Sequence, residues 1–169
     1  MDNFSEYPGG IRKKLAANFD FTENFEINSL KFDFSASFNS KNTKYAISKE
    51  IKVYEFETNE HFLFNLSQNI SVSSIINEIN TIKESIREIV RPHSDHMSSQ
   101  ILLVHVLEDE IPQDLERLAR KTKYQKGFAF GFKGWADLGL VVISLKSNRV
   151  VTHKKFSKTA AFFKPEQAV

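Results

Sequence analysis

The pattern of apolar and polar positions first becomes regular between Leu30 and Phe38. Apolar side chains occupy every second position there, and lysine, aspartate and serine occupy the positions between them. Such alternation is typical of a strand that buries one face and leaves the other face wet. Two more strands are predicted over 44–57 and 61–66, each after a short polar turn. The three strands should form an antiparallel meander.

The longest helical pattern runs from Ser71 to Val90. Its isoleucines are spaced alternately four and three residues apart, and charged side chains lie on the opposite side. A serine can cap the first turn, and Pro92 stops the helix. We expect an amphipathic helix packed on the apolar face of the sheet. A coiled coil is the alternative, but the stripe is shorter than three heptads.

Shorter elements follow and precede this helix. Two more helices are predicted over 11–19 and 113–123, and a continuous apolar strand over 101–107 should be central. The remaining strands are predicted over 127–132, 138–145 and 150–152. The order indicates an α+β fold in two layers: a mixed, largely antiparallel sheet packed on one long amphipathic helix and a shorter helix.

Composition fixes the class of protein rather than its activity. A chain of 169 residues is long enough for one domain, which we expect over 11–169 after a flexible start over 1–10. The absence of cysteine excludes disulfides, thiolate metal sites and thiol nucleophiles. The longest apolar stretch, Leu138 to Leu145, is far too short to span a membrane, and the N-terminus does not resemble a secretion signal. A soluble cytoplasmic protein without a membrane partner is expected.

Charge is distributed unevenly along the chain. Residues 112–169 contain twelve Lys and Arg against four Asp and Glu, whereas residues 1–111 contain eleven against seventeen. The balances of +8 and −6 add to the net charge of +2. A basic pole of this kind favours an anionic partner, either nucleic acid or an acidic protein surface. Equally, the two poles could face each other or the solvent.

The candidate residues for binding such a partner are basic side chains of the last third, together with one tryptophan. They are Arg117, Arg120, Lys121, Lys123, Lys126, Lys133, Trp135, Arg149, Lys154 and Lys155. Scattered Lys and Arg bind phosphates without sequence specificity. Trp135 is included because it follows a glycine in a predicted turn, where a large ring is harder to bury.

Three phenylalanines, Phe128, Phe130 and Phe132, alternate with small residues just before this tryptophan. Exposed aromatic side chains on a strand stack on bases in several RNA-binding sheets. We favour burial of these rings in the core under the long helix, because phenylalanine has no polar group that could bind water at the surface.

Two histidines and an aspartate come directly after the long helix, at His93, Asp95 and His96. Imidazole and carboxylate groups are common metal ligands, so a divalent metal site is a weak hypothesis here. A complete site needs a further ligand from elsewhere in the chain. A polar loop at the negative end of the helix dipole explains the same residues without a metal.

Asp137 and Lys146 flank the strand predicted over 138–145, and in outline this arrangement resembles metal-dependent nucleases of the restriction-enzyme type. That resemblance implies Mg²⁺ held by acidic side chains, with the lysine helping to position or deprotonate water. The middle acid of the usual motif is replaced by Ser144, so a two-carboxylate site cannot be assembled from this motif alone.

The sequence contains no glycine-rich phosphate loop and no nucleophile motif. We therefore expect a non-enzymatic interaction module without a cofactor, which binds nucleic acid or an acidic protein through its basic last third. It could be a subunit of a larger complex. A Mg²⁺-dependent nuclease with a degenerate site is the alternative.

Overall fold

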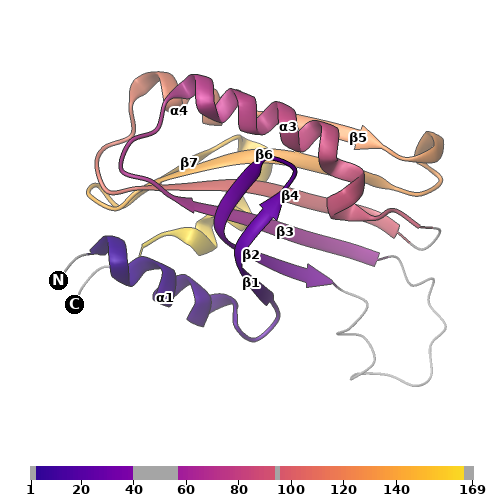
Figure 1. Ribbon diagram of the computed structural model, residues 1–169, viewed down its shortest axis with the longest axis horizontal. Helices are drawn as coiled ribbons and strands as arrows, with labels where there is room; N and C mark the ends of the chain where they lie inside the picture. Colours follow the sequence, from indigo (N-terminus) through magenta and orange to yellow (C-terminus); the bar gives the residue numbers. More distant parts are fainter. Residues whose placement is uncertain (1–2, 40–56, 94–95, 166–169) are drawn as a thin grey trace.

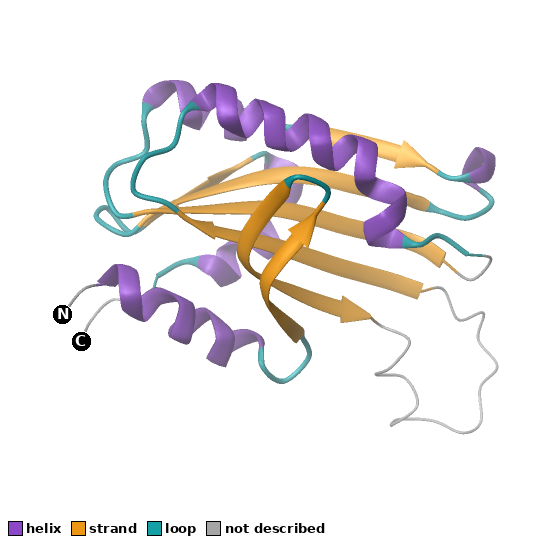
Figure 2. Cartoon of the chain, in the orientation of Figure 1, coloured by secondary structure: helices purple, strands orange, loops and turns teal. Residues whose placement is uncertain are grey.

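A single sheet runs through the middle of the molecule, and helices cover both of its faces (Figures 1 and 2). The computed structural model describes residues 3–39, 57–93 and 96–165. Within these residues the sheet has seven strands in the order β1-β2-β3-β4-β6-β5, and β7 also pairs with β6. The strands are β1 (Asp20–Ile27), β2 (Leu30–Asn39), β3 (Glu57–Leu66), β4 (His96–Leu107), β5 (Lys123–Gly127), β6 (Trp135–Ser144) and β7 (Arg149–Thr152).

The sheet is mixed and mostly antiparallel, so the predicted α+β class is confirmed. The pairs β3–β4 and β4–β6 are parallel, and the other four pairings of the described strands are antiparallel. Parallel neighbours need a crossover, which helices supply between β3 and β4 and between β4 and the β5–β6 hairpin. The N-terminal meander consists of β1, β2 and β3. The strand predicted over 44–57 lies outside the described residues, apart from its last position.

Two helices lie on the first face of the sheet, α3 (Val72–Val90) and α4 (Gln113–Lys121). The isoleucines of α3 at positions 75, 79, 82 and 86 are buried against the sheet, as their spacing requires. The hydroxyl of Ser71 caps the first turn by accepting a hydrogen bond from the Ser74 N–H, at 3.2 Å. The helix ends at Arg91, which has a left-handed backbone with φ 49°.

The second face is covered by the first and the last described segments of the chain. These segments are α1 (Asn3–Leu15), the 3-10 turn η2 (Lys154–Phe156), α5 (Ser157–Ala160) and the 3-10 turn η3 (Ala161–Phe163). Their apolar side chains pack on Phe34, Phe62 and Phe64 of the sheet. The prediction of two layers is therefore wrong: the phenylalanines of β2 and β3 form a second core, which needs a third layer to cover it.

Two predicted elements differ from the structure in extent. The helix expected from Ile11 begins at Asn3 and includes Pro8. The strand expected over 127–132 is wrong, since β5 ends at Gly127 and the 3-10 turn η1 (Ala129–Gly131) follows. Ala129 and Phe130 both have positive φ, and a strand cannot continue through two such residues.

No helix in the described part of the chain is long and apolar enough to cross a lipid bilayer.

Candidate functional site

The connection between β5 and β6 exposes two large aromatic side chains. We call residues 128–134 the aromatic turn. Phe130 and Phe132 are exposed to 104 % and 87 %, whereas Phe128 is buried at 1 %. The sequence prediction that all three rings belong to the core is therefore right for Phe128 alone. Trp135, the first residue of β6, is partly exposed beside the turn.

The base of the aromatic turn is fixed by backbone contacts. The Phe128 N–H donates to the carbonyl of Gly134, and the Lys133 N–H donates to the carbonyl of Phe128. Gly134 has φ +73° and lies directly against the backbone of Met97, so a β-carbon has no room there. The exposed rings therefore project from a turn whose two ends are held in place.

His96 also anchors the aromatic turn. Its Nδ1 lies 2.7 Å from the carbonyl oxygen of Lys133, and its Nε2 lies 2.8 Å from the hydroxyl of Ser99. A carbonyl only accepts, so Nδ1 carries the proton and Nε2 accepts from Ser99. Both ring nitrogens are thus engaged within the protein.

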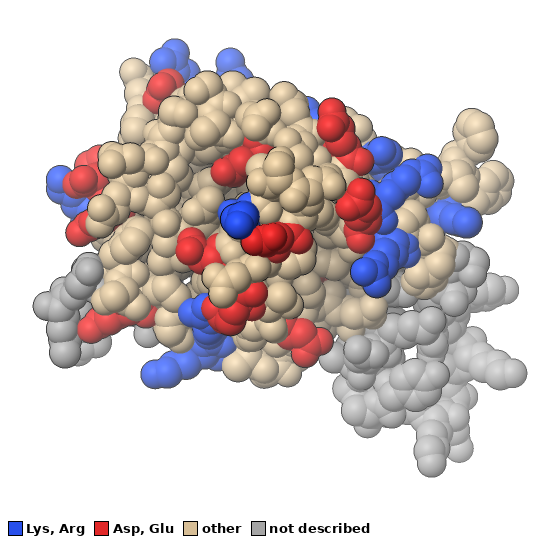
Figure 3. All heavy atoms as spheres, viewed as in Figure 1, with Lys and Arg blue, Asp and Glu red and all other residues tan. Residues whose placement is uncertain are grey.

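Basic side chains surround the aromatic turn. Lys133 belongs to the turn, and Lys126 lies on the adjoining strand β5. From α3, Arg87 lies over the ring of Phe128 at 5.6 Å and Lys83 over the ring of Tyr124 at 4.9 Å. Figure 3 shows Lys and Arg gathered at this end of the molecule, where α3 finishes and the β5–β6 connection lies, with some acidic residues between them.

The other predicted basic residues do not form one surface with this end. Arg117, Arg120 and Lys121 lie on α4, and Lys123 begins β5. Glu116 accepts from Arg120 at 2.8 Å and from Arg149 at 3.0 Å. These hydrogen bonds lower the pKa of Glu116, and the bond from Arg120 has the larger effect. The Glu116 carboxylate therefore stays charged and partly neutralises both arginines.

Lys154 and Lys155 lie on η2, which packs on the second face of the sheet. Lys155 is also paired, because its Nζ lies 2.5 Å from Oδ1 of Asp137. The predicted set therefore divides between the two faces of the sheet.

The two residues of the nuclease alternative are not brought together. Asp137 lies near the start of β6, where it accepts hydrogen bonds from Lys155 and from Gln125. Lys146 follows the far end of β6 and pairs with Asp109 at 3.2 Å. Seven residues of extended strand, roughly 23 Å, separate Asp137 from that end. No described acid stands beside both of them.

Of the three predicted metal ligands, the two that the structure describes, His93 and His96, do not form a site by themselves. Asp95 lies outside the described residues, and both nitrogens of His96 already have partners within the protein. The rings of His93 and His96 are 6.4 Å apart. The described residues contain no group of three side chains that could hold a metal ion.

A pocket lies beneath the C-terminal end of α3, and no pattern in the sequence indicated it. This α3 pocket has a volume of about 420 Å³. Its sheet side comes from β1, β2 and β3, and its helix side from the last turn of α3 and the residues that follow. Ser35 and Ser37 line it, and the sequence pattern had assigned both to a wet strand face. Helix coverage of that face could not be read from β2 alone.

His61 lies in the α3 pocket on β3, with its Nδ1 3.3 Å from the hydroxyl of Ser37. Its Nε2 is buried and has no hydrogen-bond partner among the described residues. Burial lowers the pKa of His61 to about 4, and repulsion from nearby His96 when both rings are protonated contributes in the same direction. The imidazole is therefore neutral at pH 7.

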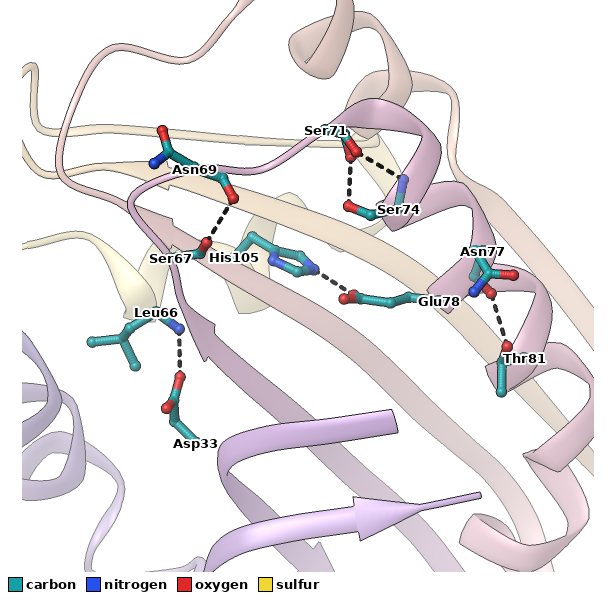
Figure 4. Close-up of polar contacts among 10 residues, drawn as sticks. All are labelled: Asp33, Leu66, Ser67, Asn69, Ser71, Ser74, Asn77, Glu78, Thr81 and His105. Carbon is teal, nitrogen blue, oxygen red and sulfur yellow. Dashed lines mark hydrogen bonds and ion pairs between the residues drawn. The ribbon is translucent and has the colours of Figure 1, made fainter. Parts of the chain in front are cut away.

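A second buried histidine lies further along the sheet. Figure 4 shows His105 of β4 pointing toward Glu78 of α3, with Nε2 and Oε2 2.8 Å apart. His105 is only 1 % exposed and does not line the α3 pocket. Glu78 is 17 % exposed, and its contact with His105 connects α3 to the sheet.

Comparison with known proteins identifies the chain at the level of a family. No curated protein and no solved structure matches it. One family model, described as "Domain of unknown function (DUF8052)", matches residues 3–165. The match covers nearly the whole chain, so this protein belongs to the DUF8052 family.

Proposed function

We propose that this protein is a non-enzymatic binding module and that its aromatic turn binds single-stranded nucleic acid. The observation that carries the proposal is the exposure of Phe130 and Phe132 on a turn whose base is fixed. Two apolar rings held in water are costly unless a partner covers them. A cytoplasmic location, as expected from the sequence, is part of this proposal.

Single strands are recognised by aromatic rings that stack on bases and by cations that hold phosphates. The aromatic turn offers both, since Lys133 lies within it and Lys126 lies on the adjoining strand. Neither lysine makes an ion pair with another described residue.

Binding is favoured over catalysis because the polar groups near the turn are used in structure. His96 is saturated by Lys133 and Ser99, and Asp137 is paired with Lys155. A reacting group would need a free acid or base close to the rings. None of the described side chains fills that role.

The test measures binding of a fluorescently labelled oligothymidylate of about 12 nucleotides, a length within the usual range for such sites. Replacing Phe130 and Phe132 with alanine should weaken binding by about fivefold or more for each ring, since stacking contributes about 1–3 kcal/mol per base. Phe162→Ala is the matched control: its ring is 64 % exposed but lies on η3, on the second face. It should change nothing.

A second measurement separates the lysines from the rings. The double substitution of Lys126 and Lys133 by alanine should reduce the slope of log K against log salt by about 1.4, because each single-strand phosphate contact contributes about 0.7. Alanine at the exposed Lys13 and Lys158 should leave the slope unchanged. Binding to polyglutamate or anionic vesicles but not to the oligonucleotide would overturn the proposal, as would equal losses in the control variants.

A further inference from the structure

We propose that the α3 pocket binds an uncharged heteroaromatic small molecule with hydrogen-bonding groups on its edge. The pocket contains none of the residues of the aromatic turn. It lies over β1, β2 and β3, whereas the turn joins β5 and β6 across the sheet. The inference is therefore independent of the proposed nucleic-acid function.

The size and walls of the pocket fit such a ligand. Its volume of about 420 Å³ falls within the usual range for ligand sites, about 300–1,000 Å³. Phe25 and Phe38 supply aromatic surface, and Leu63 and Ile89 supply aliphatic surface. Most of the contact area of typical ligand pockets is apolar in the same way.

The floor of the pocket brings several polar side chains close together. Ser37 on β2 pairs with His61 on β3, and Asn39 pairs with Asn59 one position further along the face. Ser35 and Asn59 are both buried. Polar side chains facing a core cost free energy unless hydrogen bonds satisfy them, and packing alone would favour valine or isoleucine here. A ligand with a polar edge suits a floor of this composition, and His61 supplies the hydrogen-bonding atom that lacks a described partner.

His61 defines what that edge must offer. Its Nδ1 is engaged by the Ser37 hydroxyl, while its buried Nε2 has no partner in the described part of the chain. A neutral imidazole has one donor and one acceptor nitrogen, so Nε2 needs one complementary group. An amide or an amino-substituted ring nitrogen can supply either kind of group.

The charges around the pocket favour a neutral ligand. Asp20 and Glu88 line it on the acidic side, and Arg91 lines it on the basic side. His61 is neutral at pH 7, so it adds no positive charge to the floor. Among the described lining residues the carboxylates outnumber the guanidinium, so these residues provide no positive excess with which to hold an anion.

The experiment titrates isotopically labelled protein with three neutral probes, adenine, nicotinamide and indole, and with benzoate as a charged comparison. The readout is the side-chain NMR signals of histidine. At about 10 mM probe, which detects millimolar dissociation constants, at least one neutral probe should shift the His61 signals. His153, which caps η2 away from the pocket, should not respond.

Two variants test the location of the site. His61→Gln should weaken probe binding about tenfold, the usual consequence of losing one well-placed hydrogen bond. Ser37→Val places apolar bulk in the floor and also removes the hydroxyl that contacts His61 Nδ1, so it should abolish probe binding while the oligonucleotide is still bound. Thr22→Val, on the exposed part of β1, is the matched control and should bind the probe normally.

The proposal is overturned if no neutral probe shifts His61, or if Ser37→Val binds the probe as tightly as the unmodified protein. Benzoate binding as tightly as the neutral probes would also overturn it, because the ligand would then not have to be uncharged.

Discussion

His61 is an imidazole held in its neutral form by its surroundings, with burial as the main cause and His96 as the second. Its pKa of about 4 lies below the unfolded value of about 6.5. Between these values the unfolded chain binds more protons than the folded one. The contribution of His61 to stability is therefore complete above about pH 6.5 and is lost as the pH falls toward 4.

We predict that His61→Asn flattens the pH dependence of stability in this window. The unmodified protein should lose up to about 3 kcal/mol more than the variant between about pH 7 and pH 4. Urea unfolding at several pH values checks this. Burial raises the pKa of Glu60 and gives a slope of opposite sign, but Glu60 is present in both proteins and cancels in the comparison. Parallel pH curves for the two proteins would contradict the prediction.

For single residues, the sequence predicted which large apolar side chains are buried better than it predicted what surrounds the polar ones. Phe34 and Phe62 were recognisable as core residues because phenylalanine in a strand is usually buried. Ser35 and Ser37 were not recognisable as pocket residues, since a serine facing water and a serine facing a cavity give the same alternating pattern. Only the position of α3 distinguishes the two.

Among the elements, the aromatic turn depends most on one residue. Gly134 combines φ +73° with backbone contact to Met97, whereas Gly131 has φ +91° and open space around it. Gly134→Ala should lower the free energy of unfolding by about 2–5 kcal/mol, combining left-handed strain with overpacking. Gly131→Ala should cost only the strain, about 1–2 kcal/mol.

Chemical denaturation followed by the fluorescence of Trp135, the only tryptophan of the chain, measures both glycine variants. Equal losses would mean that Met97 yields and that the turn is not anchored as described. This turn also shows why the strand prediction over 127–132 failed. The alternation of Phe with small residues is the same in a strand and in a turn that exposes two rings, and it does not indicate the positive φ values of Ala129 and Phe130.

The long helix was the element most fully encoded in the sequence, because both its stripe and its cap are local features. Ile75 and Ile82 are about two helical turns apart and so lie on the same side of the helix, and Ser71 lies at its N-terminus. In contrast, β1 was not predicted. The first half of β1 is mostly exposed and shows no clear apolar alternation. Its pairing with β2, which the sequence of β1 does not reveal, makes it a strand.

For the whole molecule, the feature that sequence reasoning missed is the third layer. Tyr7 of α1 donates a hydrogen bond to the carbonyl of Phe163, at 2.7 Å and 156 positions away in the chain. Burial raises the pKa of the Tyr7 hydroxyl, so it remains a donor across the physiological range. A local sequence pattern does not predict a contact between segments so far apart in the chain.

We predict that Tyr7→Phe lowers the free energy of unfolding by about 1–3 kcal/mol, because a buried carbonyl loses its donor. Tyr124→Phe is the matched control: no described residue hydrogen-bonds its hydroxyl, so the change should stay within about 0.5 kcal/mol. Thermal and urea unfolding of the two variants provide the measurement. A loss at Tyr124 equal to that at Tyr7 would show that the hydroxyl–carbonyl bond has no special role.

The joining of α1 to η3 has a consequence for how the chain is made. During synthesis α1 emerges before the sheet, and its partners Phe156 and Phe163 leave the ribosome about 150 residues after it. Until then the phenylalanine face of β2 and β3 has only part of its cover. The nascent chain therefore exposes an apolar sheet surface until these residues emerge, which is the kind of surface that chaperones bind and that aggregates when they are scarce.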